Sequence, residues 1–526
     1  MPDGAPSHAV CAIPRTDAPR RPGGPLLDSS DVRTPADTSE RSPGDVRARV
    51  PLARLVAVGR PYAASYALGL GLLLLTNGLA LAIPMLLRKG IDRIEAGTTL
   101  GTVAGFAAAI VAVALVQAGT RTWSRLVILG NSRRVVYDLR RRFFATLQRL
   151  GASFYDSHRT GDVMSRGVND LQLLRGFFGP GVLNLLNTVI VYTATTALML
   201  RIDVRLTLWS LALVPVLLVV VNRISRGVYH RSKAVQEQLA ELSNRVQENV
   251  SGIQQVKTFV QEDREISGFR DLCEGFRRRN LDLVRLRGWL ISFIGVFSGL
   301  GTLVVLYLGG SAVISGRITF GEFVAFNAYL ALLTWPTVAL GWIINTFQRG
   351  IGAMERVDDI LRREPDVPAG TDADEDGGPP LAGSIEFRGL TFTYEGADRP
   401  SLADVSLTIP EGSRVAIVGP VGSGKSTLVN VLARFYPVPA GTVFVDGVDV
   451  NDLPVARLRA SLAYVPQEAF LFSRTIRENV TLGHPEADEA EVERAVGLAR
   501  LTRDLETFPA GLDTRVGERG VTLSGG

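Results

Sequence analysis

The chain has 526 residues, enough for about three or four average domains, and 46% of them are hydrophobic. Its mean hydropathy of +0.19 is high for a soluble protein and points to the membrane. The net charge is +5, but arginines cluster at the ends of apolar runs, so positive-inside topology explains the excess better than a nucleic-acid partner. The two cysteines, Cys11 and Cys273, lie in unlike contexts, so we infer neither a disulfide framework nor a metal site.

Residues 1–50 are rich in Pro, Arg, Asp, Ser and Gly and have no apolar periodicity, which predicts a disordered tail. No apolar run follows the first charges, so the tail is not a signal peptide. His8 and Cys11 are close in sequence, but no folded domain is predicted around them, and we interpret them as ordinary tail residues.

Six apolar runs follow, and several approach the roughly 20 residues that a bilayer helix needs. Glycine and proline inside them are tolerated in membrane helices. Buried helices of a soluble protein would fit the shorter runs singly, but not six in succession. We therefore expect an all-α, six-helix transmembrane domain over residues 51–363, with the runs at 62–87, 103–116, 177–200, 206–221, 289–314 and 320–347.

The second and fourth runs continue as amphipathic helices, because apolar residues recur in steps of three and four. If residues 204–253 form one helix, it is about 75 Å long, whereas the hydrocarbon core is about 30 Å thick. The helix must therefore project into water, and the Arg-rich flanks place the projection on the cytoplasmic side. Two cytoplasmic turns result, near 154–158 and 258–263. They are either ordinary helix reversals or contacts with a cytosolic domain, and spacing leaves both open. The two apolar stripes are Val135, Leu139, Phe143, Leu147 and Leu150, and Val235, Leu239, Leu242, Val246, Val250 and Ile253.

Residues 364–383 are acidic and rich in Pro and Gly, which predicts a linker. Beyond it the pattern changes to alternation, with Ile385, Phe387, Leu390 and Phe392 typical of strands. We expect an α/β nucleotide-binding domain over 384–526.

The strongest motif follows a short apolar run, Val415–Val418, that predicts a buried strand. It is the G-x-x-x-x-G-K-[ST] pattern of a phosphate-binding loop. Glycines let backbone N–H groups cradle phosphate, Lys425 supplies a charge, the Ser426 hydroxyl can reach Mg²⁺, and the following helix adds its positive end. A chance glycine-rich turn is the alternative, which the preceding strand and following helical run oppose. The predicted ATP ligands are Gly419, Pro420, Val421, Gly422, Ser423, Gly424, Lys425, Ser426 and Thr427.

With these motifs, residues 50–526 resemble an ATP-binding cassette (ABC) exporter, specifically a half-transporter of the bacterial multidrug type. The resemblance implies that Tyr394 stacks on adenine and that Gln467, in YVPQEAFLF, senses Mg²⁺ and the terminal phosphate. Taken alone, a strand tyrosine is more often a core residue and such a glutamine is usually a loop amide. We predict Mg²⁺ contacts from Ser426 and Gln467.

The resemblance extends to the regions that join the parts of such a transporter. Val516–Gly520 matches a segment that contacts the membrane domain, and Thr160–Arg166 and Ser251–Glu262 match the coupling loops. Leu523–Gly526 begins the family signature, which implies that Ser524, Gly525 and Gly526 contact ATP across a dimer interface. A chance Ser-Gly-Gly in a loop is common.

The resemblance also implies a dimer with a second half-transporter, identical or related, in a plasma membrane that the chain crosses several times. The cassette and the N-terminus would be cytoplasmic. ATP binding would swing the helices from inward-open to outward-open and export an amphiphilic small molecule, drug or lipid. A non-catalytic regulatory or channel-like subunit gated by ATP is the alternative.

The chain stops at Gly526, before the acidic strand, the water-activating Glu and the switch His that the resemblance implies. Because phosphoryl transfer needs a group that orients the attacking water, we expect this polypeptide to bind ATP without hydrolysing it and to contain no catalytic residue. Whether it is an enzyme, an ATPase that drives translocation, stays open. The strand expected beside Val415–Val418 is also missing, so we expect a compromised cassette fold.

Overall fold

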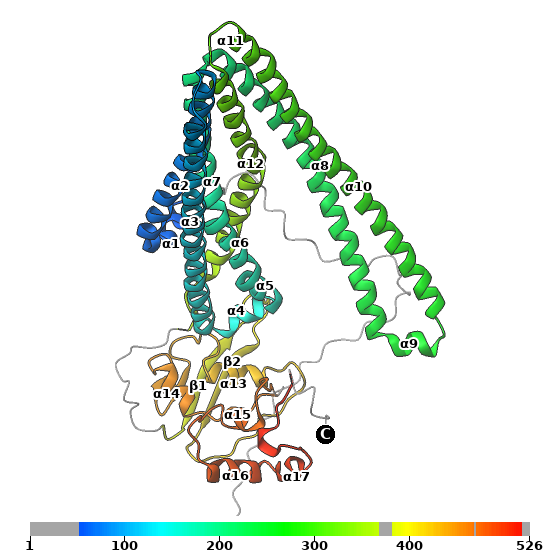
Figure 1. Ribbon diagram of the computed structural model, residues 1–526. Coiled ribbons are helices and arrows are strands. Elements are labelled where there is room, and N and C mark those ends of the chain that lie inside the picture. The colour runs from blue at the N-terminus through cyan, green and yellow to red at the C-terminus, as the bar shows by residue number, and fades with distance from the viewer. Residues whose placement is uncertain (1–51, 368–380, 468–469, 518–526) are drawn as a thin grey trace, which may run out of the picture. The chain divides into compact units, whose positions relative to one another are not determined.

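The structure, a computed structural model, describes residues 52–367, 381–467 and 470–517. Long helices up to Leu361 are followed by a small sheet with short helices from Ile385 onward (Figure 1). The first group comprises α1 (Leu52–Gly59), η1 (Arg60–Tyr62), α2 (Ala63–Glu95), α3 (Leu100–Arg149), α4 (Ala152–Ser157), α5 (Thr160–Ser165), η2 (Arg166–Asp170), α6 (Leu171–Gly176), η3 (Phe177–Gly181), α7 (Val182–Ile202), α8 (Val204–Ser251), α9 (Ile253–Thr258), α10 (Glu262–Val304), η4 (Val305–Gly309), α11 (Gly310–Ile314) and α12 (Phe320–Leu361).

Five helical segments among the described residues are long and apolar enough to cross a bilayer: Arg54–Glu95, Leu100–Arg149, Thr160–Ile202, Glu262–Ile314 and Phe320–Leu361. These contain five of the six predicted runs, which confirms a helical membrane region. The third segment unites α5, η2, α6, η3 and α7, and the fourth unites α10, η4 and α11.

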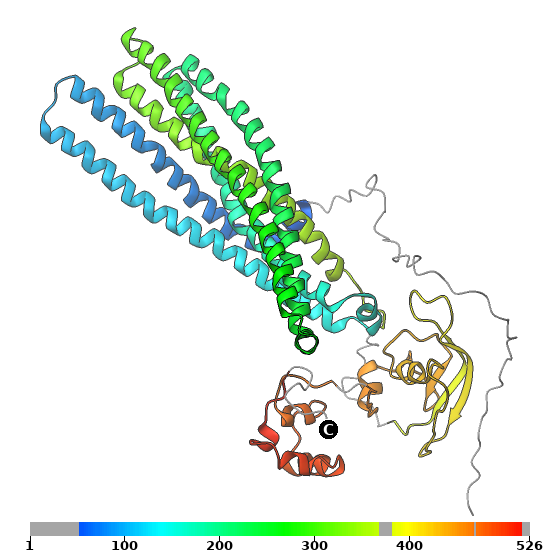
Figure 2. The same ribbon diagram turned by 90° about the vertical axis from the view of Figure 1, so that its right-hand side faces the viewer.

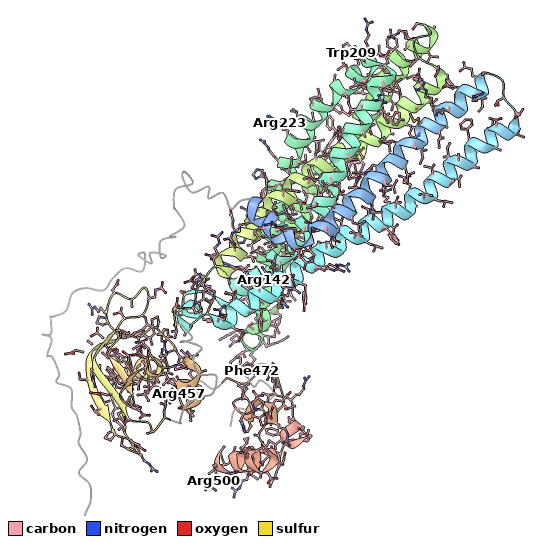
Figure 3. All side chains as sticks on the ribbon, turned by 90° about the vertical axis from the view of Figure 1, so that its left-hand side faces the viewer. Arg142, Trp209, Arg223, Arg457, Phe472 and Arg500 are labelled. Atoms are coloured by element: carbon pink, nitrogen blue, oxygen red, sulfur yellow. The ribbon has the colours of Figure 1, made fainter. Side chains whose placement is uncertain are left out.

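The remaining predicted run lies in α8, a 48-residue helix in which some side chains of the apolar half lie outside the described residues. Trp209 and Arg223 lie at separate levels of this helix, about 21 Å apart along its axis (Figure 3).

The helix α8 pairs with α10 along its length, with α9 at the reversal, as both Figure 1 and Figure 2 show. Arg231 donates to the Asp282 carbonyl at 3.0 Å, and Arg245 pairs with Glu265 at 2.7 Å. At 48 residues α8 is about 72 Å long. This length confirms that the helix runs far beyond a hydrocarbon core.

A second cluster of contacts joins α3, η2 and α12. The predicted stripe on α3 is confirmed, because Val135, Leu139 and Phe143 are buried in one apolar core. Beside it, the buried Asp170 of η2 accepts from Arg356 of α12 at 2.6 and 2.9 Å. A bidentate pair fixes direction as well as distance, so it holds η2 on α12.

The sheet has strand order β2-β1-β3-β4, and all neighbours are antiparallel. Its core includes Leu390, Val443 and Val450, with Val431 from the helix that follows the phosphate loop. The elements are β1 (Ile385–Phe392), β2 (Leu402–Ile409), α13 (Lys425–Leu432), β3 (Val443–Val445), β4 (Val448–Asp449), α14 (Val455–Ala460), α15 (Ile476–Val480), α16 (Glu489–Leu498), α17 (Thr502–Leu505) and η5 (Gly511–Asp513).

The prediction of a buried strand at Val415–Val418 is wrong for this structure. These residues form no strand, and the Val418 side chain is 88% exposed. A strand preceding a phosphate loop is buried only when neighbouring strands pair with it and helices cover it. None of the described strands pairs with this segment, because the antiparallel sheet is made by other residues.

Candidate nucleotide-binding site

The phosphate-binding loop leads directly into α13, whose first residue is Lys425. Gly422 and Gly424 have φ values of +82° and +83°, a region that residues with a Cβ atom rarely adopt. At Gly424 a Cβ atom would also lie 2.5 Å from the Ser401 carbonyl oxygen and 2.8 Å from Leu402 Cδ2. Glycine is therefore required where the loop turns into the helix.

Lys425 lies inside the curl of its own loop. Its Nζ atom donates to the carbonyl oxygens of Gly419 at 3.0 Å and Pro420 at 2.8 Å. The ammonium group is thus held where a phosphate-binding loop receives the terminal phosphates of a nucleotide. The N-terminus of α13 adds unpaired N–H groups and a positive dipole end.

The two residues after Lys425 face different ways. The Ser426 side chain is exposed at the first turn of α13, where a hydroxyl can reach a metal ion held by phosphates. Thr427 is buried, and its hydroxyl accepts from Tyr394 at 3.1 Å. The structure therefore places Thr427 in the core side of the helix, and its role as an ATP ligand stays a prediction.

Tyr394 is half-buried beside the loop. Its ring meets Phe392 and Tyr436 edge-on, with centroids 5.1 Å apart in both pairs. The hydrogen bond to Thr427 ties this aromatic cluster to α13. Tyr394 thus combines the packing of a core residue with a place next to the phosphate loop, and stacking on adenine stays a prediction.

Gln467 ends the segment that runs along α13. Tyr464 donates to Asn430 of α13 at 3.0 Å, which fixes this segment beside the helix. Gln467 itself is exposed three residues further on. Its role as an Mg²⁺ ligand together with Ser426 stays a prediction. No cluster of three or more His, Cys, Asp or Glu suited to a metal occurs in the described parts of the chain.

Other predicted contacts are only partly described. Val516 is buried, and its N–H donates to the Arg474 carbonyl at 2.8 Å. Residues 518–520, Ser524, Gly525 and Gly526 lie outside the described residues, as do His8 and Cys11.

The turn predicted near residues 154–158 contains a contact that sequence reasoning missed. Tyr436, four residues beyond α13, donates to Asp156 of α4 at 2.7 Å. Burial and the adjacent Asp156 carboxylate raise the pKa of the Tyr436 hydroxyl, so the hydroxyl remains a donor even in more alkaline solution than an ordinary tyrosine does. The only sequence signal was an aromatic residue between the end of the helix and Pro437, which is not specific.

A glycine-rich phosphate loop on a small domain, preceded by helices of bilayer length, defines a membrane protein with an attached nucleotide-binding domain. The family model described as "ABC transporter transmembrane region" matches residues 66–337, and the one described as "ABC transporter" matches residues 402–526. The chain therefore belongs to the ABC transporter family, as a half-transporter of the exporter type.

Curated relatives align with most of the chain. The chain is 33% identical over 470 residues to the probable multidrug resistance ABC transporter ATP-binding/permease protein YheI of Bacillus subtilis, covering 89% of this chain and 80% of that protein. It is 33% identical over 429 residues to the multidrug resistance-like ATP-binding protein MdlA of Escherichia coli, covering 81% and 72%.

Proposed function

We propose that this protein uses ATP to export an amphiphilic small molecule, drug or lipid across the plasma membrane by alternating access. The observation that carries the proposal is the formed phosphate loop, with Lys425 in its curl, on the same chain as helices of bilayer length. The relatives named above are described as a probable multidrug resistance transporter and a multidrug resistance-like protein, which supports an amphiphilic cargo.

ATP would bind with Mg²⁺. The residues present fit this group, because the loop supplies N–H donors and Lys425, while Ser426 and Gln467 present exposed oxygen atoms. ATP would shift the equilibrium toward the conformation that binds it more tightly. In this proposal that conformation is the outward-open state of the helices. The Tyr436–Asp156 hydrogen bond supports a route from the cassette to the helix ends.

The partner would be a second half-transporter, identical or related. The part of α8 beyond Arg223 exposes apolar side chains. Val250 lies about 40 Å beyond Arg223 along the helix axis, so we expect this part of the helix to be outside the membrane and in water. A contiguous exposed apolar surface marks an interaction site. On α8 this surface comprises Leu239, Val246 and Val250, and Val284 of α10 is exposed in the same way.

Transport into vesicles tests the proposal. We expect inside-out vesicles that contain the protein to accumulate a fluorescent amphiphile above its outside concentration when ATP and Mg²⁺ are added. Vesicles with the Lys425→Ala variant should not accumulate it, because the phosphates lose their cation. An ATP-gated flux that stops when the two concentrations are equal would contradict export and support the channel-like alternative.

A further inference from the structure

A cavity of about 240 Å³ lies among α2, α3, α7 and α12. Figures 1 and 2 show α2 and α3 side by side along their lengths. Much of the cavity wall is apolar, with several leucines, Pro336 and the Trp335 side chain. Such a lining, with a few polar groups, is typical of sites for small molecules.

The charged residues that line the cavity are all positive. Two arginines, Arg121 and Arg125, are among the residues that line it, and these residues include no Asp or Glu. No ion pair joins either arginine to a carboxylate within the described part of the chain. Here the cavity contains two positive charges and lacks a negative one.

Side-chain amides extend the polar surface inward from the arginines. Asn77 of α2 is buried and donates to Asn187 of α7 at 3.1 Å. Because the Asn187 oxygen accepts that bond, its NH₂ group is left without a partner among the described residues and can donate to a ligand. Gln117 lies one turn before Arg121 on α3 and also lines the cavity.

The depth of these groups follows from the helix rise. With the short connection between α2 and α3 on the outer side, α3 starts there at Leu100. Arg121 is then about 32 Å and Arg125 about 38 Å along the axis, next to the cytoplasmic edge of a core about 30 Å thick. Trp335 of α12 is only about 23 Å from its own outer end at Phe320. The cationic end of the cavity is thus at the inner boundary and the apolar end is within the bilayer.

A second hollow, about 310 Å³, shares Arg125 and is lined by Arg133 two turns further toward the cytoplasm. The basic surface therefore continues from the cavity toward the cytoplasmic leaflet, where anionic lipid head groups lie. The first cavity is smaller than the roughly 300–1,000 Å³ of drug-sized sites, so it suits a head group and the start of a tail.

We propose that this cavity selects amphiphiles with an anionic head group, such as a phosphate or sulfate, bound by Arg121 and Arg125 from the inner leaflet. Arginine binds such oxyanions with two parallel hydrogen bonds, and the amides of Asn187 and Gln117 would donate to the oxygen atoms that join the head group to the tail. This inference rests on the proposed export function and narrows its substrate class. It excludes cationic amphiphiles, because two unpaired guanidinium groups repel them.

Native mass spectrometry of the full chain in a nonionic detergent, without nucleotide, tests the proposal by counting bound amphiphiles. The probes are dodecyl phosphate, dodecylphosphocholine and dodecyltrimethylammonium, which share one tail. We expect at least tenfold tighter binding of dodecyl phosphate than of dodecylphosphocholine, and the weakest binding for the cation. Equal binding of the three probes would overturn the proposal.

Substitutions of the two arginines test whether they cause the preference for the phosphate head group. Arg121→Gln with Arg125→Gln should reduce the preference for phosphate to about one. The matched control, Arg140→Gln with Arg141→Gln, removes the same charge from exposed positions of the same helix and should keep the preference. If the glutamine variant does not fold, Arg121→Lys with Arg125→Lys keeps the charge and should weaken dodecyl phosphate binding severalfold. An unchanged preference in both cavity variants would refute the assignment.

Two further arms identify the source of the head group. Phosphatidylglycerol should displace dodecyl phosphate, whereas inorganic phosphate should require at least a hundredfold higher concentration, because it lacks a tail. Displacement by inorganic phosphate at equal concentration would contradict the proposal that the ligand is an amphiphile. It would indicate that the cavity binds a soluble anion instead. Nucleotide is absent from all of these binding experiments. A negative binding result would therefore refute the anionic amphiphile but not ATP-driven export, which the vesicle assay tests. A negative vesicle assay would refute export but not the measured binding preference.

Discussion

The Lys425→Ala variant is expected to bind ATP about 10- to 100-fold more weakly than the wild-type protein. Hydrogen bonds from a charged donor are worth about 1.5–3 kcal/mol, and the ammonium group lies in the curl of the loop. Titration with a fluorescent ATP analogue in the presence of Mg²⁺ measures the dissociation constant.

The Lys257→Ala variant is the control for this prediction. Lys257 is exposed in α9, where it pairs with Glu262 at 3.0 Å. Its loss also removes one positive charge, but from a surface ion pair that contributes little. Similar ATP affinities for the Lys425→Ala and wild-type proteins would show that the loop is not the nucleotide site.

The Gly424→Ala variant should destabilise the cassette by about 2–4 kcal/mol, since it combines a left-handed backbone with a steric clash. The added Cβ atom would lie 2.5 Å from the Ser401 carbonyl oxygen, a backbone atom that cannot move independently. The temperature midpoint of unfolding, measured by circular dichroism in detergent, reports the loss.

The Gly422→Ala variant separates the cost of the left-handed backbone from the cost of the steric clash. Gly422 has almost the same φ value, +82°, but nothing lies within 4 Å of a Cβ atom built there. We expect it to cost only about 1 kcal/mol. If both variants unfold at the same temperature, the close approach of the Gly424 backbone to β2 is not a constraint on the fold.

The sequence predicted the features that rest on local pattern. Apolar runs and three-four periodicity identified the long helices, and the stripe of Val135, Leu139 and Phe143 is buried as expected. The phosphate-loop motif located Lys425 at the start of a helix, because glycine requirements and helix starts are set by neighbouring residues.

Features that depend on distant partners were harder to predict. Val415–Val418 has the composition of a buried strand, but burial also needs neighbouring strands that its own residues cannot specify. Tyr436 meets Asp156 across 280 residues, and Arg121 joins a cavity that four helices build. Local composition does not encode such pairings.

The central claim is that nucleotide binding at the loop moves the membrane helices. It is tested most directly by a distance measured within one chain, between a spin label on the exposed Cys273 of α10 and one at Arg140→Cys on α3, with Cys11→Ser as background. Pulsed electron paramagnetic resonance should show the distance distribution shifting when ATP and Mg²⁺ are added to the protein in lipid nanodiscs. The same chain with Lys425→Ala should show no shift. An identical distribution with and without ATP, in a protein that binds the nucleotide, would contradict the account.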